Sequence, residues 1–295
     1  MNTALVRELE LLMEDNKKIV VLTADMGYSV FETIQKEYPS RFFNLGITEQ
    51  SSTSIAAGLA LMGYEVFFYA QAPFITMRNY EQVRLDLAYN NVNVRLIGAN
   101  AGLSLNQLGV SHFAVEDVAL MRLLPNMNVF TPGTPDEMKW CIRESHNTRG
   151  PTYLRFSKTF SESSSVFPKH NRTDGILLIS GGLLKMGIDI ASSLKKEGIF
   201  LSCYSYPVVW PFDYKQFAKQ VGSLPIFTLE EHSILGGLGT IVSEAVIDMN
   251  MKNRVTKFGL NNAFIHGAGS IDYLFKSNGL DPKHIQSVIQ NQLKK

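Results

Sequence analysis

The chain has 295 residues, enough for two domains of ordinary size, each with its own core. Its 28 Lys and Arg nearly balance its 27 Asp and Glu, and the formal charge of +1 gives no indication of a nucleic-acid partner or an acidic tail. Cys141 and Cys203 lie in no metal-binding or redox spacing, which argues against a zinc site and a disulfide scaffold. The amino-terminal residues carry several charges, and no apolar run approaches the roughly 18 residues of a membrane span, so we expect a cytoplasmic protein.

Helical and strand patterns alternate through the first half of the chain. The run 19–23 (Ile-Val-Val-Leu-Thr) is typical of a strand covered on both faces. Further strands are predicted at 42–45, 65–69, 92–98 and 128–131, and helices at 3–15, from Thr48 onward, at 75–90, 115–124 and 136–145. This alternation predicts an α/β fold with a doubly wound parallel sheet.

The composition changes between about 157 and 174, where the chain is polar, rich in serine and without hydrophobic period. A second α/β series follows, with strands predicted at 175–180, 200–204 and 224–229 and helices at 187–196 and 239–250. We therefore predict a first doubly wound domain at 1–160, a linker at 161–173 and a second doubly wound domain at 174–295. The glycines of Gly-Gly-Leu-Gly239 fit either a phosphate loop or close packing of a helix.

The stretch 41–63 places a carboxylate at a turn between a strand and a helix. Gly46 breaks the predicted strand, Thr48 is a candidate helix cap, and Glu49 follows directly. Such turns, just past the carboxyl edge of a parallel strand, are where open α/β sheets bind ligands. A plainer interpretation is that Glu49 only favours the helix dipole, and spacing alone does not decide between the two.

Four motifs in the segment 41–135 resemble the pyrimidine-binding domain of transketolases. They are Phe-Phe-Asn-Leu-Gly-Ile-Thr-Glu-Gln50, Ala-Ala-Gly-Leu-Ala60, Gly-Val-Ser-His112 and Val-Glu-Asp-Val-Ala-Leu-Met-Arg122. The later run Thr-Leu-Glu-Glu-His-Ser-Ile-Leu-Gly-Gly237 is similar to the C-terminal domain of the same family. Deoxyxylulose-phosphate synthases and the beta subunits of 2-oxoacid dehydrogenases share this two-domain pattern. Because the motifs agree in order over nearly the whole chain, the resemblance is more specific than any one of them.

The resemblance implies thiamine diphosphate as cofactor and a catalytic role for Glu49. In the family, the matching glutamate hydrogen-bonds the aminopyrimidine ring, and this ring removes the proton from the thiazolium carbon. Phe74 and Tyr80 match positions that line the ring, and Met77 stands where an aromatic side chain is common. On the residues alone, all three also fit an ordinary core between a helix and a sheet.

His112 lies in a polar loop after a predicted strand. A lone histidine is more often a surface or core group than a catalytic one. The resemblance aligns His112 with a histidine that contacts substrate hydroxyls, which makes it a candidate catalytic and substrate-binding residue.

The substrate positions depart from the family pattern. Sugar-phosphate transketolases surround the substrate phosphate with an Arg, a Ser and an Arg, where this chain has Asn2, Ser29 and Lys158. Without two forked guanidinium groups, bidentate binding of a phosphate is weakened. Arg155 and Arg78 are candidates to supply a compensating charge.

Two further substrate positions differ in the loop at 99–111. Leu108 replaces an Asp that contacts an acceptor hydroxyl, and Asn100 replaces a histidine. Because leucine accepts no hydrogen bond, a hydroxyl buried against it would cost about 1–3 kcal/mol. We therefore expect transfer of a two-carbon ketol unit from a ketose to an aldose, with substrates other than the common pentose phosphates.

The family's diphosphate-binding element is missing from the sequence. Transketolases hold the diphosphate and its Mg or Ca ion through a Gly-Asp-Gly motif, whereas the only Asp-Gly here is Asp174-Gly175, directly after the predicted linker. The chain thus resembles the smaller subunit of a split transketolase, whose partner binds the diphosphate and is the main binder of the Mg or Ca ion. We expect no metal-ligating residue on this chain. We expect two copies of each chain, with the pyrimidine domains in contact.

Two alternatives remain open at this point. A beta subunit of a 2-oxoacid dehydrogenase shares the fold and the glutamate, although Gly-Val-Ser-His112 and Val-Glu-Asp-Val-Ala-Leu-Met-Arg122 favour a transketolase. A non-catalytic subunit that only binds a partner is the other alternative, and the joint presence of Glu49, Phe74 and His112 argues against it.

Overall fold

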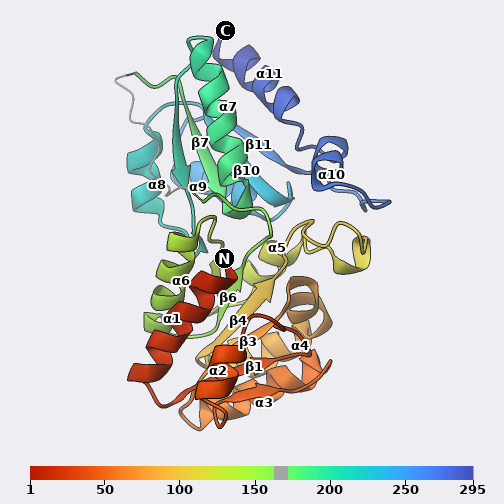
Figure 1. Ribbon diagram of the computed structural model, residues 1–295. Helices are drawn as coiled ribbons and strands as arrows, with labels where there is room; N and C mark the ends of the chain where they lie inside the picture. The colour runs from red at the N-terminus through yellow and green to blue at the C-terminus, as the bar shows by residue number, and fades with distance from the viewer. Residues whose placement is uncertain (163–171, 295) are drawn as a thin grey trace.

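Two parallel sheets, each with helices on both faces, build the two halves of the molecule, and the sheets are stacked end to end (Figure 1). The computed structural model describes residues 1–162 and 172–294. The predicted α/β class with two parallel-sheet domains is confirmed. The predicted linker lies largely in 163–171, outside the described residues.

The first sheet has seven strands in the order β2-β1-β3-β4-β6-β5-β9. Their bounds are β1 Ile19–Thr23, β2 Phe42–Asn44, β3 Glu65–Gln71, β4 Val94–Ala99, β5 Asn128–Phe130, β6 Thr152–Arg155 and β9 Val208–Trp210. All neighbours pair in parallel except β5 and β9. Every residue of β1, β4, β5 and β6 is buried, which explains why β1 is apolar on both faces. Parallel pairing brings the carboxyl ends of six strands to one edge.

Helices cover this sheet in two layers. One face carries α1 Asn2–Asp15, α2 Glu32–Glu37 and α6 Pro135–Asn147, whose apolar side chains share one core cluster with β1 and β3. The other face carries α3 Glu49–Leu61, the wide helical turns η1 Phe74–Arg78 and η2 Val83–Tyr89, the short α4 Tyr80–Gln82, and α5 Asp117–Arg122. Helices α1 and α6 lie side by side in Figure 1.

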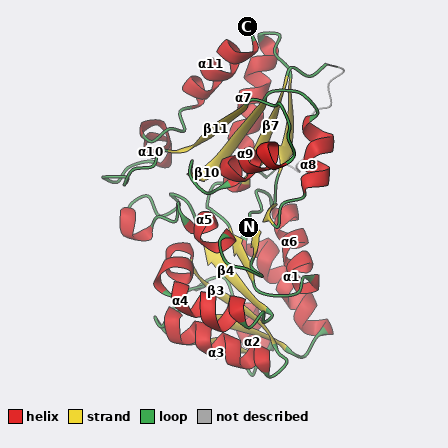
Figure 2. Ribbon diagram, turned by 180° about the vertical axis from the view of Figure 1, so that it is seen from behind, coloured by secondary structure: helices red, strands yellow, loops and turns green. Residues whose placement is uncertain are grey.

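The second sheet has four parallel strands in the order β11-β10-β7-β8. Their bounds are β7 Gly175–Ser180, β8 Leu201–Ser205, β10 Ile226–Ser233 and β11 Val255–Leu260. One face is covered by α7 Leu184–Lys196, α10 Ile271–Ser277 and α11 Pro282–Leu293, and the other by α8 Tyr214–Val221 and α9 Leu238–Asp248 (Figures 1 and 2). The 3-10 turns η3 Val110–His112 and η4 Gly181–Leu183 complete the described elements.

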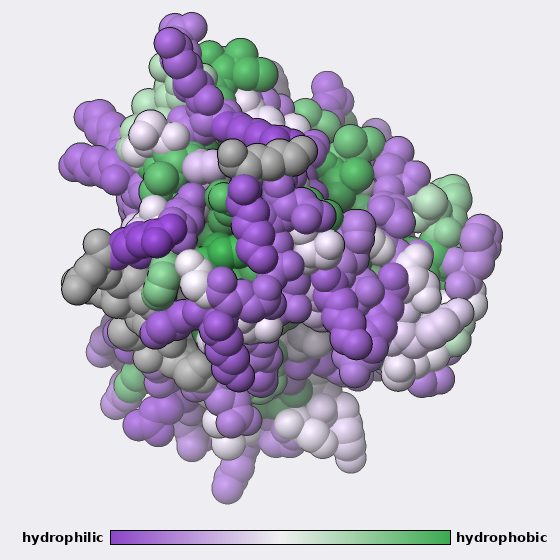
Figure 3. Space-filling view, turned by 90° about the horizontal axis from the view of Figure 1, so that it is seen from above, coloured by the Kyte–Doolittle hydropathy of each residue, from purple (hydrophilic) through white to green (hydrophobic). Residues whose placement is uncertain are grey.

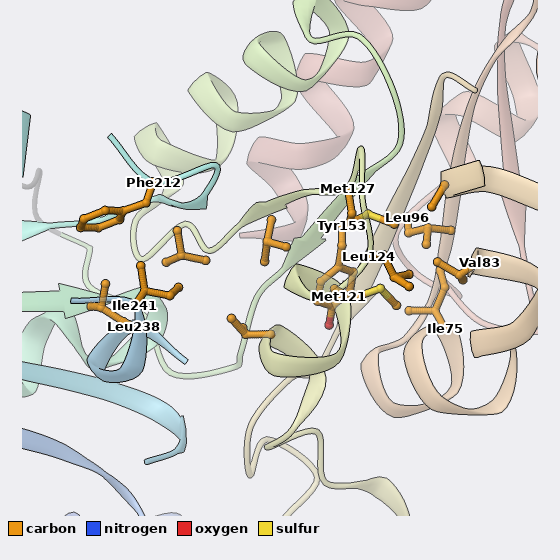
Figure 4. Packing of buried hydrophobic residues seen from close by; sticks show 14 of the residues in the cluster. Ile75, Val83, Leu96, Met121, Leu124, Met127, Tyr153, Phe212, Leu238 and Ile241 are labelled. Carbon is orange, nitrogen blue, oxygen red and sulfur yellow. The ribbon is translucent and has the colours of Figure 1, made fainter. Parts of the chain in front are cut away.

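The two halves share a continuous hydrophobic core. One cluster runs from Ile75 under the first sheet through Met121 and Tyr153 to Leu238 and Phe212 of the second half (Figure 4). In addition, β9 comes from the second half of the chain and pairs with β5 at the edge of the first sheet. Burial of apolar surface along this boundary holds the two sheets together.

The segment predicted as one helix at 75–90 is helical but irregular. Wide turns at both ends flank a break at Asn79, whose φ is −113°. Asn79 is buried and donates to Thr53 Oγ1 at 2.6 Å, a tertiary contact that the apolar pattern does not contain. Wide turns of this kind occur often at functional sites.

Several elements were not predicted: α2, β6, β9, α8, β11, α10 and α11. Thr48 occupies the N-cap position of α3, as predicted, but its hydroxyl donates to the carbonyl of Leu45 and does not accept from an amide of α3. Among the described residues, no helix combines the length and the apolar character needed to cross a membrane. Seen from the end formed by the second half, the visible surface is mainly hydrophilic (Figure 3).

Candidate functional site

Glu49 is buried at the first turn of α3. Only 3% of its surface is exposed, and its Oε2 accepts a hydrogen bond from Arg78 Nη1 at 2.7 Å. The backbone around it is tied to the segment that carries Arg78, because Thr53 donates to the carbonyl of Glu49 at 2.7 Å and accepts from Asn79. The sequence therefore places a carboxylate in a fixed position past the carboxyl end of β2.

Phe74 and His112 extend this cluster. The guanidinium carbon of Arg78 lies 3.9 Å from the centroid of the Phe74 ring, a cation–π contact within one turn of η1. The His112 ring meets Phe74 edge to face, with centroids 5.2 Å apart. The elements α3, η1 and η3 thus bring together three of the predicted residues, Glu49, Phe74 and His112. Arg78 lies between Glu49 and Phe74.

Tyr80 and Met77 lie differently. Tyr80 packs against the core on the helical face of the first sheet, and its hydroxyl donates to the carbonyl of Leu120 at 2.9 Å. Burial raises the pKa of Tyr80. Met77 is exposed on η1. The hydroxyl of Tyr80 is therefore used to hold α5, and the cofactor-binding roles of both residues stay predictions.

Three of the four predicted substrate positions outside the cluster follow carboxyl ends of strands in the first sheet. Ser29 follows β1, Asn100 follows β4 and Lys158 follows β6. Ser29 is exposed, with its backbone amide bound to the Glu32 carboxylate, and Lys158 is exposed, with its amide bound to Ser104 Oγ at 2.8 Å. Parallel strands place these residues along the edge where α/β sheets bind ligands.

The loop 99–111 holds the remaining predicted substrate position, Leu108, and its Asn100 contacts Gln71 of β3, a residue that the sequence did not indicate. Leu108 is 56% exposed, so it offers an apolar surface to whatever binds there. Asn100 donates to Gln71 Oε1 at 2.9 Å, and Gln71 ends β3 on the same edge of the sheet. The sequence signal that could have found Gln71 is that it is a polar residue just past the strand predicted at 65–69.

Arg155 does not offer a compensating charge to a substrate. It is buried, with its Nε 2.9 Å from Asp117 Oδ2 and its guanidinium bound to the carbonyl groups of Glu231 and Ala114. All these partners are internal. The suggestion that Arg155 supplies a compensating charge to the substrate is wrong, because its guanidinium is buried and paired with Asp117.

The glycine-rich turn before α9 is not an open phosphate loop. The Glu230 carboxylate accepts from the amides of Leu238 and Gly239 at 2.6 and 2.8 Å, which are the donors that an anion would need. Burial raises the pKa of Glu230 to about 7. Gly237 and Gly239 instead permit close approach, since a Cβ at either would overlap neighbouring side chains.

Comparison with known proteins decides the family. Residues 1–161 match the family described as "Transketolase, pyrimidine binding domain", and residues 168–285 match "Transketolase, C-terminal domain". The chain belongs to the transketolase family. The resemblance inferred from the motifs is thus confirmed, and the pyrimidine-binding domain places the chain among the thiamine-diphosphate enzymes.

Relatives of this transketolase-family chain cover nearly its full length. It is 32% identical over 304 residues to a putative transketolase C-terminal section of Methanocaldococcus jannaschii, covering 97% of this chain and 95% of the relative. It is 32% identical over 261 residues to one of the subunits of an apulose-4-phosphate transketolase of Actinobacillus succinogenes, covering 85% and 84%. A solved split-gene transketolase, an inactive β4 tetramer, matches with a TM-score of 0.84 at 31% identity, covering 99% and 98%.

The described residues of this transketolase-family chain fit a pyrimidine ring. Glu49 offers a buried carboxylate with one oxygen already accepting a hydrogen bond from Arg78, and Phe74, whose half-buried ring contacts the same Arg78, offers an aromatic face. A protonated ring nitrogen can donate to the Glu49 carboxylate, and a planar heterocycle can stack on the Phe74 ring. Within 1–162 and 172–294, no three His, Cys, Asp or Glu side chains gather in a group that could hold a metal ion.

Proposed function

We propose that this chain is the smaller subunit of a split transketolase that uses thiamine diphosphate to move a two-carbon ketol unit from a ketose to an aldose. The observation that carries the proposal is the cluster of Glu49, Phe74 and His112 beside Arg78, at the edge of a sheet that belongs to a pyrimidine-binding domain. Relatives that are themselves sections or subunits of transketolases support it.

In this proposal the cofactor, when bound, supplies the carbon nucleophile, and the chain positions it. Glu49 holds a proton at a ring nitrogen of the aminopyrimidine, and Phe74 orients that ring. His112, half-buried and in contact with Phe74, hydrogen-bonds a hydroxyl of the substrate. Tyr80 and Met77 would close the ring pocket along η1 and α4.

The partner in this proposal is a separate chain that binds the diphosphate through a Gly-Asp-Gly motif and holds the Mg or Ca ion. The inactive β4 tetramer formed by the split relative agrees with a subunit that lacks half of the site. We expect two copies of each chain in the active assembly, with the pyrimidine-binding domains in contact.

The substrate proposed is a sugar phosphate other than xylulose 5-phosphate or ribose 5-phosphate. Asn2 and Lys158 stand where two arginines hold the phosphate in sugar-phosphate transketolases, and the buried Arg155 does not replace them. Relatives that act on apulose 4-phosphate support an unusual ketose, and this compound is the first to test.

Isothermal titration calorimetry tests the split arrangement. The chain alone, the chain with its Gly-Asp-Gly partner and the partner alone are each titrated with thiamine diphosphate in excess Mg²⁺. We expect tight binding only to the mixture, together with turnover only by the mixture. Tight binding by the chain alone would contradict the proposal.

A further inference from the structure

One guanidinium group makes both contacts that the proposed function assigns to the pyrimidine ring. Arg78 Nη1 donates to Glu49 Oε2 at 2.7 Å, and the Arg78 guanidinium carbon lies 3.9 Å above the Phe74 ring. A guanidinium is flat and carries N–H donors at its edge, so it stacks on an aromatic ring and hydrogen-bonds a carboxylate at the same time. A protonated aminopyrimidine likewise has a flat face that can stack on an aromatic ring and an N–H at its edge that can donate to a carboxylate.

We propose that Arg78 is a gate for the cofactor: its guanidinium must leave Glu49 and Phe74 before the pyrimidine ring takes the same contacts. This inference rests on the proposed function of the site. The exclusion is steric, because two flat groups do not occupy one face of Phe74 at stacking distance, and the His112 ring already contacts Phe74 in an edge-to-face pair, with centroids 5.2 Å apart.

The structure gives Arg78 the freedom that a gate needs. Its side chain is 39% exposed, whereas Glu49 is buried, so the cation has a path to solvent and the carboxylate does not. Among the described residues, its ion-pair and cation–π partners are Glu49 and Phe74, both within the site. The backbone at Arg78 lies in the wide turn η1, next to the break at Asn79.

The gate has a consequence for the chain when no cofactor is bound. Arg78 neutralises a buried carboxylate, and a buried charge left without a partner is costly. Arg78 therefore stabilises the free subunit and competes with the cofactor in the assembled enzyme. These effects have opposite signs when Arg78 is removed, which separates a gate from a plain structural ion pair and from a ligand-binding residue.

The test compares Arg78→Ala and Arg78→Lys with Arg84→Ala, a matched loss of one exposed positive charge from the neighbouring turn η2. In the two-subunit complex, the Kd of thiamine diphosphate with Mg²⁺ is measured by calorimetry, and the thermal midpoint of each free variant by circular dichroism. We expect Arg78→Ala to bind the cofactor roughly tenfold more tightly while its free subunit melts at a lower temperature. Arg78→Lys, which keeps the charge without the flat stack, should fall between wild type and Arg78→Ala, and Arg84→Ala should match wild type.

An unchanged or larger Kd in both Arg78 variants would overturn the gate. A failure of the proposed function looks different, because then the wild-type complex does not bind thiamine diphosphate, or Glu49→Gln leaves its Kd and the exchange of its thiazolium hydrogen unchanged. If Arg78→Ala does not fold, Arg78→Lys still gives the sign of the change in Kd.

Discussion

Arg155 Nε lies 2.9 Å from Asp117 Oδ2 in the interior of the molecule, at the junction of the two sheets. The same aspartate oxygen accepts from the Tyr153 hydroxyl at 2.6 Å, and the Arg155 guanidinium donates to the carbonyl of Glu231 on β10 at 3.2 Å. Asp117, Tyr153 and Arg155 belong to the pyrimidine-binding half and Glu231 to the other. A buried polar network thus crosses the hydrophobic boundary and fixes how the halves meet.

Breaking this ion pair should destabilise the whole chain. Arg155→Met leaves Asp117 as a buried charge without its cation, which costs about 3–5 kcal/mol. Urea unfolding followed by circular dichroism measures the change in the free energy of unfolding. The control is Lys185→Met, which removes an exposed partner of Asp189 and should cost no more than about 0.5 kcal/mol. Similar losses in both variants would show that the buried network does not hold the halves together.

His232 should make stability depend on pH. Its Nδ1 faces the carbonyl of Ser233 at 2.8 Å and its Nε2 receives the amide of Ala119 at 3.3 Å, so the neutral ring donates at one nitrogen and accepts at the other. Burial lowers its pKa from 6.5 to about 4, while Asp117 opposes and Arg155 adds to this shift. Between these values the unfolded chain binds a proton that the folded chain does not, so stability falls as pH falls.

The change at His232 is isolated by comparison with His232→Gln. The difference in free energy of unfolding, wild type minus variant, should be constant above pH ~6.5 and decrease by on the order of 2–3 kcal/mol as pH falls to ~4. Denaturant unfolding at a series of pH values measures it. The raised pKa of Glu230 gives the opposite slope below pH ~7 and is present in both proteins, so it cancels in the difference. A difference independent of pH would refute the neutral, buried state of His232.

Alanine substitutions at two glycines should change the stability of the chain in opposite directions. A Cβ at Gly133 would overlap the carbonyl oxygen of Gly181, where the two halves touch, and we expect Gly133→Ala to cost about 1–3 kcal/mol. A Cβ at Gly58 on the exposed side of α3 meets no atom within 4 Å, so Gly58→Ala should stabilise the isolated chain by about 0.5–1 kcal/mol. Thermal unfolding of the two variants, side by side, checks both signs. Stabilisation by Gly133→Ala would mean that the halves separate more easily than this contact implies.

Glu49→Gln should lower turnover by several orders of magnitude in the two-subunit complex. The amide keeps the size of the side chain and loses the ability to hold a proton for the aminopyrimidine. Exchange of the thiazolium hydrogen for deuterium, followed by NMR, reports that step directly. The matched control is Glu244→Gln, which changes an exposed partner of Arg122 in the same way. Unchanged exchange in Glu49→Gln would remove Glu49 from the mechanism.

The sequence predicted the elements whose signal is local. The apolar runs at 19–23 and 175–180 became β1 and β7, and the motifs around Glu49 and His112 led to the family. Strand β6 was missed because Thr-Tyr-Leu-Arg155 ends in a charge that is neutralised only by Asp117 in the folded chain. Strand β9 was missed because its three residues pair with β5 of the other half, nearly 80 residues away in sequence.

In the candidate site, too, the sequence motifs indicated residues, whereas the contacts that depend on the tertiary fold could not be predicted. Glu49, Phe74 and His112 could be named from motifs, and their proximity followed from the fold. The contact of Arg78 with Glu49 joins residues 29 positions apart through an irregular turn, and no periodic pattern predicts such a turn. Arg155 looked available for a substrate because charge suggests exposure, whereas burial with a partner reverses that expectation.

The residues at the expected substrate positions should disfavour the common pentose phosphates. Lys158 is exposed past the end of β6, and Asn2 begins α1, so the positions at which we expect the substrate phosphate offer one point charge and one amide in place of two forked cations. Leu108 presents an exposed apolar side chain at the position where we expect an acceptor hydroxyl to be recognised. With the partner present, we expect turnover of xylulose 5-phosphate and ribose 5-phosphate at a kcat/KM at least tenfold below that of an apulose 4-phosphate reaction, because each unpaired hydroxyl costs about 1–3 kcal/mol. Leu108→Asp and Lys158→Arg should together raise kcat/KM for the pentose phosphates. The control Lys17→Arg changes an exposed lysine just before the amino end of β1, at the opposite edge of the sheet, and should not raise it. Equal efficiency of the wild-type complex on xylulose 5-phosphate and apulose 4-phosphate would show that these positions do not select the substrate.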